Sequence, residues 1–140
     1  MSETSTRIVL RGACAGAGIA LEPLRRFSAQ AGLPAGLQHD LLVIADEIVS
    51  NWLKYGCAAA QTAEMDIQVS VEPSRLLLRF ADTGPAFNPL AAAPSDPDAS
   101  LEQRQAGGYG LHLVRALAGF QRYARVGDRN VLELSLPVPG

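Results

Sequence analysis

The spacing of apolar residues changes partway along the chain, and this change constrains the fold more than any other feature. From about residue 35 to residue 55 the apolar side chains recur every three or four positions, which is the period of an α-helix. From residue 65 to residue 71 apolar and polar side chains alternate, which is the period of a half-buried strand. A chain that contains both periods is expected to pack helices on a sheet.

The long helix carries a wide apolar stripe that covers roughly half of its circumference. The stripe comprises Leu41, Ile44, Ala45, Ile48, Val49, Trp52 and Leu53. The other expected elements are a strand at 6–10, a helix starting at Glu22-Pro23 and ending at 32–34, strands at 65–71 and 76–82, a loop at 89–106, a helix at 107–118, and a hairpin of strands 122–126 and 131–136. This order predicts an α/β two-layer sandwich, with helices on one face of a mixed, mainly antiparallel sheet.

Composition sets the outer limits on function. The 140 residues are 48% apolar and 19% charged, which fits a single globular domain over residues 1–140. A net charge of −2 does not indicate the basic surface that binds nucleic acid. No apolar run approaches the length of a membrane-spanning helix. The N-terminus lacks the apolar core of a signal peptide, and the two cysteines lie far apart without metal-ligand spacing. We therefore expect a cytoplasmic protein with reduced thiols.

The first motif that could carry chemistry lies on the long helix, in the run EIVSNWLKY. Glu47 and Asn51 are i,i+4 neighbours, and Lys54 borders the same apolar stripe. A carboxylate, an amide oxygen and an ammonium on one ridge suit a metal-bound polyphosphate, because an amide oxygen is a hard ligand for Mg²⁺ and a carboxylate can accept a proton. The alternative is an ordinary solvated helix face.

The second motif, DTGPAFNP, follows the strand at 76–82. The period of two places Asp82 on the same face as Leu78 and Phe80, toward the apolar layer. A carboxylate in that position needs a partner, and the amino group of a ligand would serve, while Gly84 would let a flat ring approach the backbone. The alternative is a common strand-ending turn.

The third motif is the glycine-rich run GGYGLHLVR, which opens the expected helix at 107–118. Free N–H groups at a helix N-terminus favour an anion. The spacing matches neither a Walker sequence nor a Rossmann fingerprint. The alternative is a flexible loop that ends at a helix.

Together, the three motifs resemble the N, G1 and G2 boxes of the GHKL ATPases, the superfamily of gyrase, heat-shock-90, histidine-kinase and MutL ATPases. They occur in the order and on the elements that this superfamily uses, and the resemblance covers most of the chain. The phrases DTGPAFNPL and GGYGLHLVRAL are similar in particular to the small anti-sigma-factor serine/threonine kinases of bacterial partner-switching systems. In contrast, the Lys54-Tyr55 pair resembles the N box of sensor histidine kinases.

The resemblance implies a role for each matching residue. Glu47 would be the general base, Asn51 the Mg²⁺ ligand, and Asp82 the acceptor for the adenine amino group. The other residues implied to line the ATP site are Lys54, Gly84, Phe87, Gly108, Tyr109, Gly110 and Leu111. Residues from about 90 to 107 would form a lid over the nucleotide.

The function implied is that of an ATP-dependent protein-serine/threonine kinase. Such a protein binds a sigma factor and phosphorylates a small anti-sigma-factor antagonist, and a homodimer would fit the subgroup. Two alternatives remain open. One is an ATP-gated protein-binding module that transfers no phosphate, and the other is the detached catalytic domain of a histidine kinase.

Overall fold

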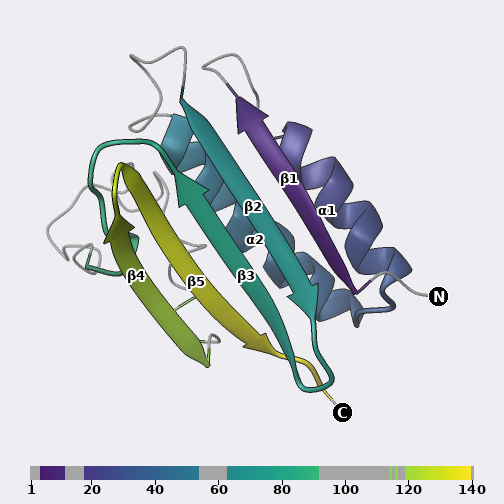
Figure 1. Ribbon diagram of the computed structural model, residues 1–140. Helices are drawn as coiled ribbons and strands as arrows, with labels where there is room; N and C mark the ends of the chain where they lie inside the picture. The colour runs from purple at the N-terminus through teal and green to yellow at the C-terminus, as the bar shows by residue number, and fades with distance from the viewer. Residues whose placement is uncertain are drawn as a thin grey trace, which may run out of the picture.

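The computed structural model describes residues 4–11, 18–53, 63–91, 114, 116 and 119–139, and the structural statements below concern these residues. Its elements are β1 (Ser5–Arg11), α1 (Gly18–Gln30), α2 (Ala35–Asn51), β2 (Glu64–Val71), β3 (Arg75–Asp82), the 3₁₀ turn η2 (Pro89–Ala91), β4 (Phe120–Val126) and β5 (Arg129–Pro137). Figure 1 shows the strands side by side in one twisted sheet, with α1 and α2 behind it.

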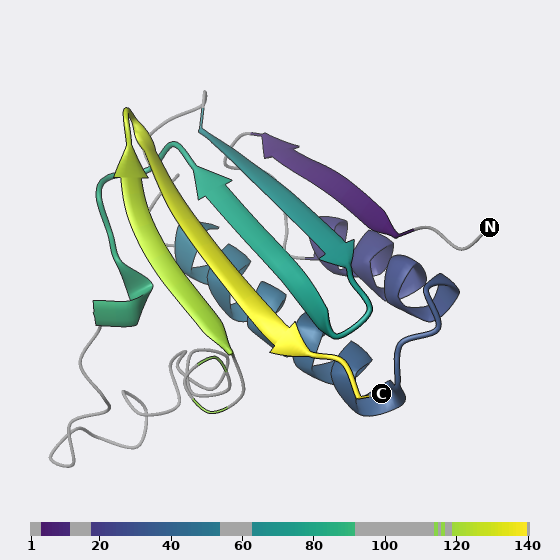
Figure 2. The ribbon, with the colours of Figure 1, turned by 60° about the horizontal axis from the view of Figure 1, so that its bottom comes forward.

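The five strands form one sheet in the order β1-β2-β3-β5-β4, and every pairing among them is antiparallel. Both described helices cover the same face, as Figure 2 shows from a second direction. The predicted α/β two-layer sandwich with a mainly antiparallel sheet is therefore confirmed.

The core lies between the sheet and the helices. Register places one side chain from each central strand in every layer, as in the row Ile67, Phe80 and Leu132. These residues pack against the apolar stripe of α2, in which Leu41, Ile44, Ala45, Ile48, Val49 and Trp52 are buried as predicted, whereas Leu53 is half-buried. Burial of this face supplies the main driving force for the two-layer arrangement.

Helix α1 begins four residues earlier than the sequence suggested. The predicted start at Glu22-Pro23 is wrong, because the helix begins at Gly18 and Pro23 lies inside it. Proline at this sixth position lies beyond the first turn, so it removes the hydrogen bond to the carbonyl four residues before it and crowds that carbonyl. The helix ends at Gln30, and the φ of 72° at Gly32, with its N–H bond to the Ala29 carbonyl, belongs to the Schellman motif that follows.

Two expected helical segments lie partly outside the described residues. Helix α2 runs to Asn51, and Trp52 and Leu53 continue it in a wider π-type turn, so the predicted end at 55 is beyond the description. Of the predicted helix at 107–118, the structure describes Val114 and Ala116, both helical, and Val114 is buried in the core.

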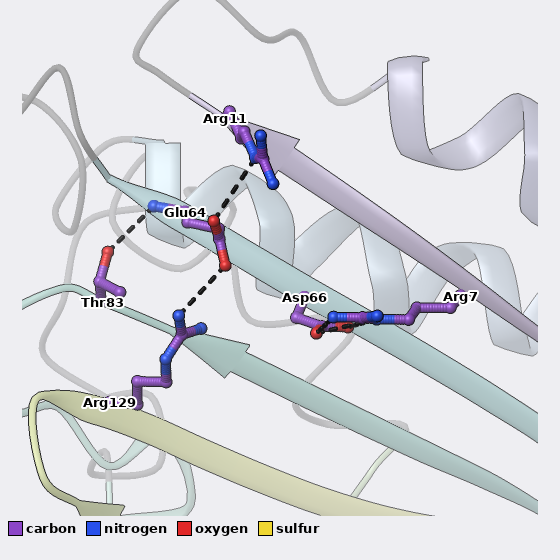
Figure 3. Close-up of polar contacts among 6 residues, drawn as sticks. All are labelled: Arg7, Arg11, Glu64, Asp66, Thr83 and Arg129. Carbon is purple, nitrogen blue, oxygen red and sulfur yellow. Dashed lines mark hydrogen bonds and ion pairs between the residues drawn. The ribbon is translucent and has the colours of Figure 1, made fainter.

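Ion pairs connect strands on the sheet face opposite α1 and α2 (Figure 3). The Arg7 guanidinium donates to both carboxylate oxygens of Asp66, at 2.6 to 3.1 Å, and these hydrogen bonds hold the pKa of Asp66 below its ordinary value despite its burial. Glu64 pairs with Arg11 at 3.5 Å and with Arg129 at 3.1 Å. These contacts join β1, β2 and β5 across the sheet.

Candidate functional site

The site residues expected on α2 and β3 lie at the same end of the sandwich. Asn51 is the last residue of α2 and Asp82 is the last residue of β3. Both figures place the C-terminal ends of α2 and β3 toward the same edge of the molecule (Figures 1 and 2). The antiparallel sheet also brings the start of β5 to this end, because Asp82 pairs with Asn130.

Glu47 and Asn51 are in contact, as their i,i+4 spacing predicts. The Asn51 amide nitrogen donates to Glu47 Oε1 at 3.4 Å, and both side chains are half-buried. This hydrogen bond uses an N–H of the amide and leaves the oxygen of Asn51 for another group. A carboxylate and a neighbouring amide oxygen suit a divalent cation that prefers oxygen ligands. The third residue of this motif, Lys54, lies outside the described residues.

Asp82 lies on the helix-covered face of the sheet, as predicted, and is half-buried. Its Oδ1 accepts hydrogen bonds from the Gly84 N–H at 2.8 Å and from the Asn130 amide nitrogen at 3.1 Å. The sequence indicated a ligand as the partner of this carboxylate, whereas the fold itself supplies two donors to one oxygen. The other oxygen, Oδ2, receives no hydrogen bond from any residue that the structure describes. One oxygen therefore fixes the carboxylate and the other can accept from a ligand.

The loop after Asp82 is held by residues on both sides of it. Thr83 joins it to β2, since its hydroxyl accepts from the Glu64 N–H at 2.9 Å (Figure 3). Arg125 of β4 donates to the Gly84 carbonyl at 2.7 Å. Phe87 follows in the same loop and is 50% exposed, so this loop presents a large apolar side chain to solvent. The chain then enters η2 through a bond from the Leu90 N–H to the Asn88 side chain.

Sequence reasoning missed two residues of the β4–β5 hairpin that contact this loop, Arg125 and Asn130, and also Tyr123, whose hydroxyl donates to Asn130. Their position depends on the two-residue turn at Gly127 and Asp128. Of the two turn residues, Gly127 has a positive φ of 61°, as a tight turn with glycine at its first central position requires. The Gly-Asp pair predicts a hairpin from the sequence. It does not predict that β5 pairs with β3, and this pairing is what brings Asn130 to Asp82.

Several predicted site residues cannot be placed. Gly108, Tyr109, Gly110 and Leu111 lie outside the described residues, as does the proposed lid beyond residue 91. Among the helices that the structure describes, none has the length and apolar character needed to cross a bilayer.

Two known proteins with similar sequences are protein kinases by name. The serine/threonine-protein kinase BtrW of Bordetella bronchiseptica is 29% identical over 101 residues, which are 72% of this chain and 71% of BtrW. The serine-protein kinase RsbW of Bacillus licheniformis is 28% identical over 82 residues, which are 56% of this chain and 51% of RsbW.

A solved structure and a family model complete the comparison. The Acinetobacter baumannii histidine kinase AdeS aligns with a TM-score of 0.48 and 19% identity, over 74% of this chain and 48% of AdeS. The model of the histidine kinase-like ATPase domain matches residues 14–136, which include all three motifs. The chain therefore belongs to the family of histidine kinase-like ATPase domains.

Proposed function

We propose that the chain is an ATP-dependent protein-serine/threonine kinase that acts as an anti-sigma regulatory factor. The observation that carries the proposal is the state of the Asp82 carboxylate. Oδ1 is fixed by two N–H donors, and Oδ2 remains to accept a hydrogen bond from the adenine amino group. The kinase assignment is supported by the similarity to BtrW and RsbW, both of which are named as kinases.

The proposed chemistry is transfer of the γ-phosphoryl group to a seryl or threonyl hydroxyl. Glu47 takes the hydroxyl proton as that oxygen attacks the γ-phosphorus, the bond between this phosphorus and the β–γ bridging oxygen breaks, and ADP leaves. The hydrogen bond to Glu47 uses the amide nitrogen of Asn51, so the amide oxygen would be a ligand for Mg²⁺. The ion would neutralise charge on the phosphates. Such catalysis consists mainly of positioning, so a small domain suffices.

The proposed protein substrate is a small anti-sigma-factor antagonist, and the proposed binding partner is a sigma factor. Both follow from the resemblance to the partner-switching kinases. In this scheme phosphorylation releases the antagonist, and the kinase is then able to bind the sigma factor.

The test combines labelled ATP, candidate antagonists encoded beside this protein, and variants of α2. Glu47→Gln should bind ATP nearly as the parent does but transfer phosphate about 10²–10⁴-fold more slowly, the range for loss of a general base. Asp46→Asn is the matched control, because Asp46 is exposed on the same helix and should not affect transfer. Asn51→Ala should lose Mg-dependent binding and transfer together. If the parent binds ATP yet phosphorylates no candidate, the ATP-gated binding module replaces the kinase.

A further inference from the structure

Asn130 is a buried polar residue at the start of β5, and its side chain makes hydrogen bonds to five groups. It is 6% exposed and lies directly opposite Asp82 in the sheet. Its amide nitrogen donates to Asp82 Oδ1 at 3.1 Å, to the Pro85 carbonyl at 2.8 Å and to the Gly84 carbonyl at 3.4 Å. Its amide oxygen accepts from the Phe87 N–H at 3.0 Å and from the Tyr123 hydroxyl at 2.5 Å.

These partners fix the orientation of the amide. The nitrogen faces three oxygens, each of which can accept a hydrogen bond, and the oxygen faces an N–H and an O–H. A rotated amide would place its oxygen against three acceptors and its NH₂ group against a backbone donor. Because buried groups without partners are costly, the rotated state is strongly disfavoured.

The fixed amide determines which oxygen of Asp82 faces a ligand. The terminal torsion of an aspartate is soft, so a single bond from the Gly84 N–H would leave the carboxylate free to rotate. The second donor, from Asn130, fixes Oδ1 in place, so Oδ2, which receives no hydrogen bond from any residue that the structure describes, is the oxygen left to accept from a ligand. We propose that Asn130 is a positioning residue, which sets the selectivity for adenine by holding Asp82 Oδ2 against the 6-amino group. This inference rests on the proposed nucleotide site.

Arg125 separates this role from simple support of the loop. It donates to the Gly84 carbonyl at 2.7 Å, so it holds the same loop, but no hydrogen bond joins it to Asp82. Loss of Arg125 should loosen the loop and lower the affinity for every nucleotide by a similar factor. Loss of Asn130 should in addition remove the advantage of nucleotides that carry a 6-amino group.

The experiment compares Mg-ATP with Mg-purine riboside triphosphate, which lacks only the 6-amino group, in a calorimetric titration. The parent should prefer ATP by about 10- to 100-fold, as expected for one hydrogen bond to a charged group. In Asn130→Ala this preference should fall to within about threefold. Arg125→Met should keep the parental ratio even if both affinities drop. Tyr123→Phe removes only the hydroxyl that orients the amide, and should lower the ratio partially.

Each outcome decides between distinct claims. An Asn130→Ala ratio equal to that of the parent refutes the positioning role and leaves the nucleotide site intact. Equal loss of the ratio in Arg125→Met shows that loop order alone sets selectivity, and also refutes it. If Asn130→Ala does not fold, as judged by its circular dichroism and melting, an unchanged ratio in Tyr123→Phe refutes the role instead. A parent that binds no nucleotide refutes the proposed function itself.

Discussion

Replacing Asp82 by asparagine should convert an acceptor for adenine into a donor. The Gly84 N–H and the Asn130 amide both donate to Oδ1, so the oxygen of the new amide must occupy that position. Its NH₂ group then occupies the position of Oδ2 and faces the 6-amino group of adenine. Loss of a charge-assisted hydrogen bond and burial of two opposed donors together cost roughly 3–5 kcal/mol. ATP affinity should therefore fall by about 10²- to 10⁴-fold.

Titration calorimetry with Mg-ATP and Mg-ITP measures this effect. Inosine has a carbonyl at the 6-position, so Asp82→Asn should lose less affinity for ITP than for ATP, and the ATP/ITP ratio should fall. Thermal unfolding without nucleotide is the control. The free energy of unfolding should change by less than about 1 kcal/mol, because both donors to Oδ1 keep an acceptor. Affinity for ATP within threefold of the parent would refute the reasoning.

Further predictions concern stability. Asp66→Asn places an NH₂ group against the Arg7 guanidinium and should lower the stability measured by urea unfolding, by an amount that the exposure of Arg7 keeps small. Because the folded pKa of Asp66 is lowered, the stabilisation is present above its ordinary value of 3.8 and is lost as the pH falls through the folded pKa, so parent and variant should converge in acid. Gly32→Ala should lower the free energy of unfolding by about 1 kcal/mol, because φ is positive at Gly32. Gly36→Ala should raise it by about 0.5–1 kcal/mol, because Gly36 lies in a helix and faces open space. Equal effects of the two substitutions in chemical unfolding would contradict this assignment.

The sequence was sufficient for the layers of the fold and for contacts within one element. The helical period placed Glu47 beside Asn51, and the strand period placed Asp82 on the helix-covered face. Both predictions depend only on local geometry. The start of α1 was wrong because Pro23 was treated as a residue of the first turn, whereas it is the sixth residue of the helix.

Contacts between distant segments were beyond this reasoning. Asn130 lies 48 residues after Asp82, and the two meet only because β5 pairs with β3 while β4 takes the sheet edge. Nothing in the local pattern around Asn130 distinguishes it from an ordinary residue after a turn. The sequence therefore identified the residue proposed to contact the ligand, but not the residue that orients it.

The central claim is that the folded chain binds Mg-ATP through Asp82, and thermal unfolding of the parent protein with and without Mg-ATP tests it most directly. At a concentration 100 times the dissociation constant, ATP should stabilise the fold by about 2.7 kcal/mol. For a chain of this length the melting temperature should then rise by roughly 5–15 °C, and Asp82→Asn should reduce the rise to about 2 °C or less at the same concentration. A parent protein whose melting temperature does not change at millimolar Mg-ATP would contradict the account.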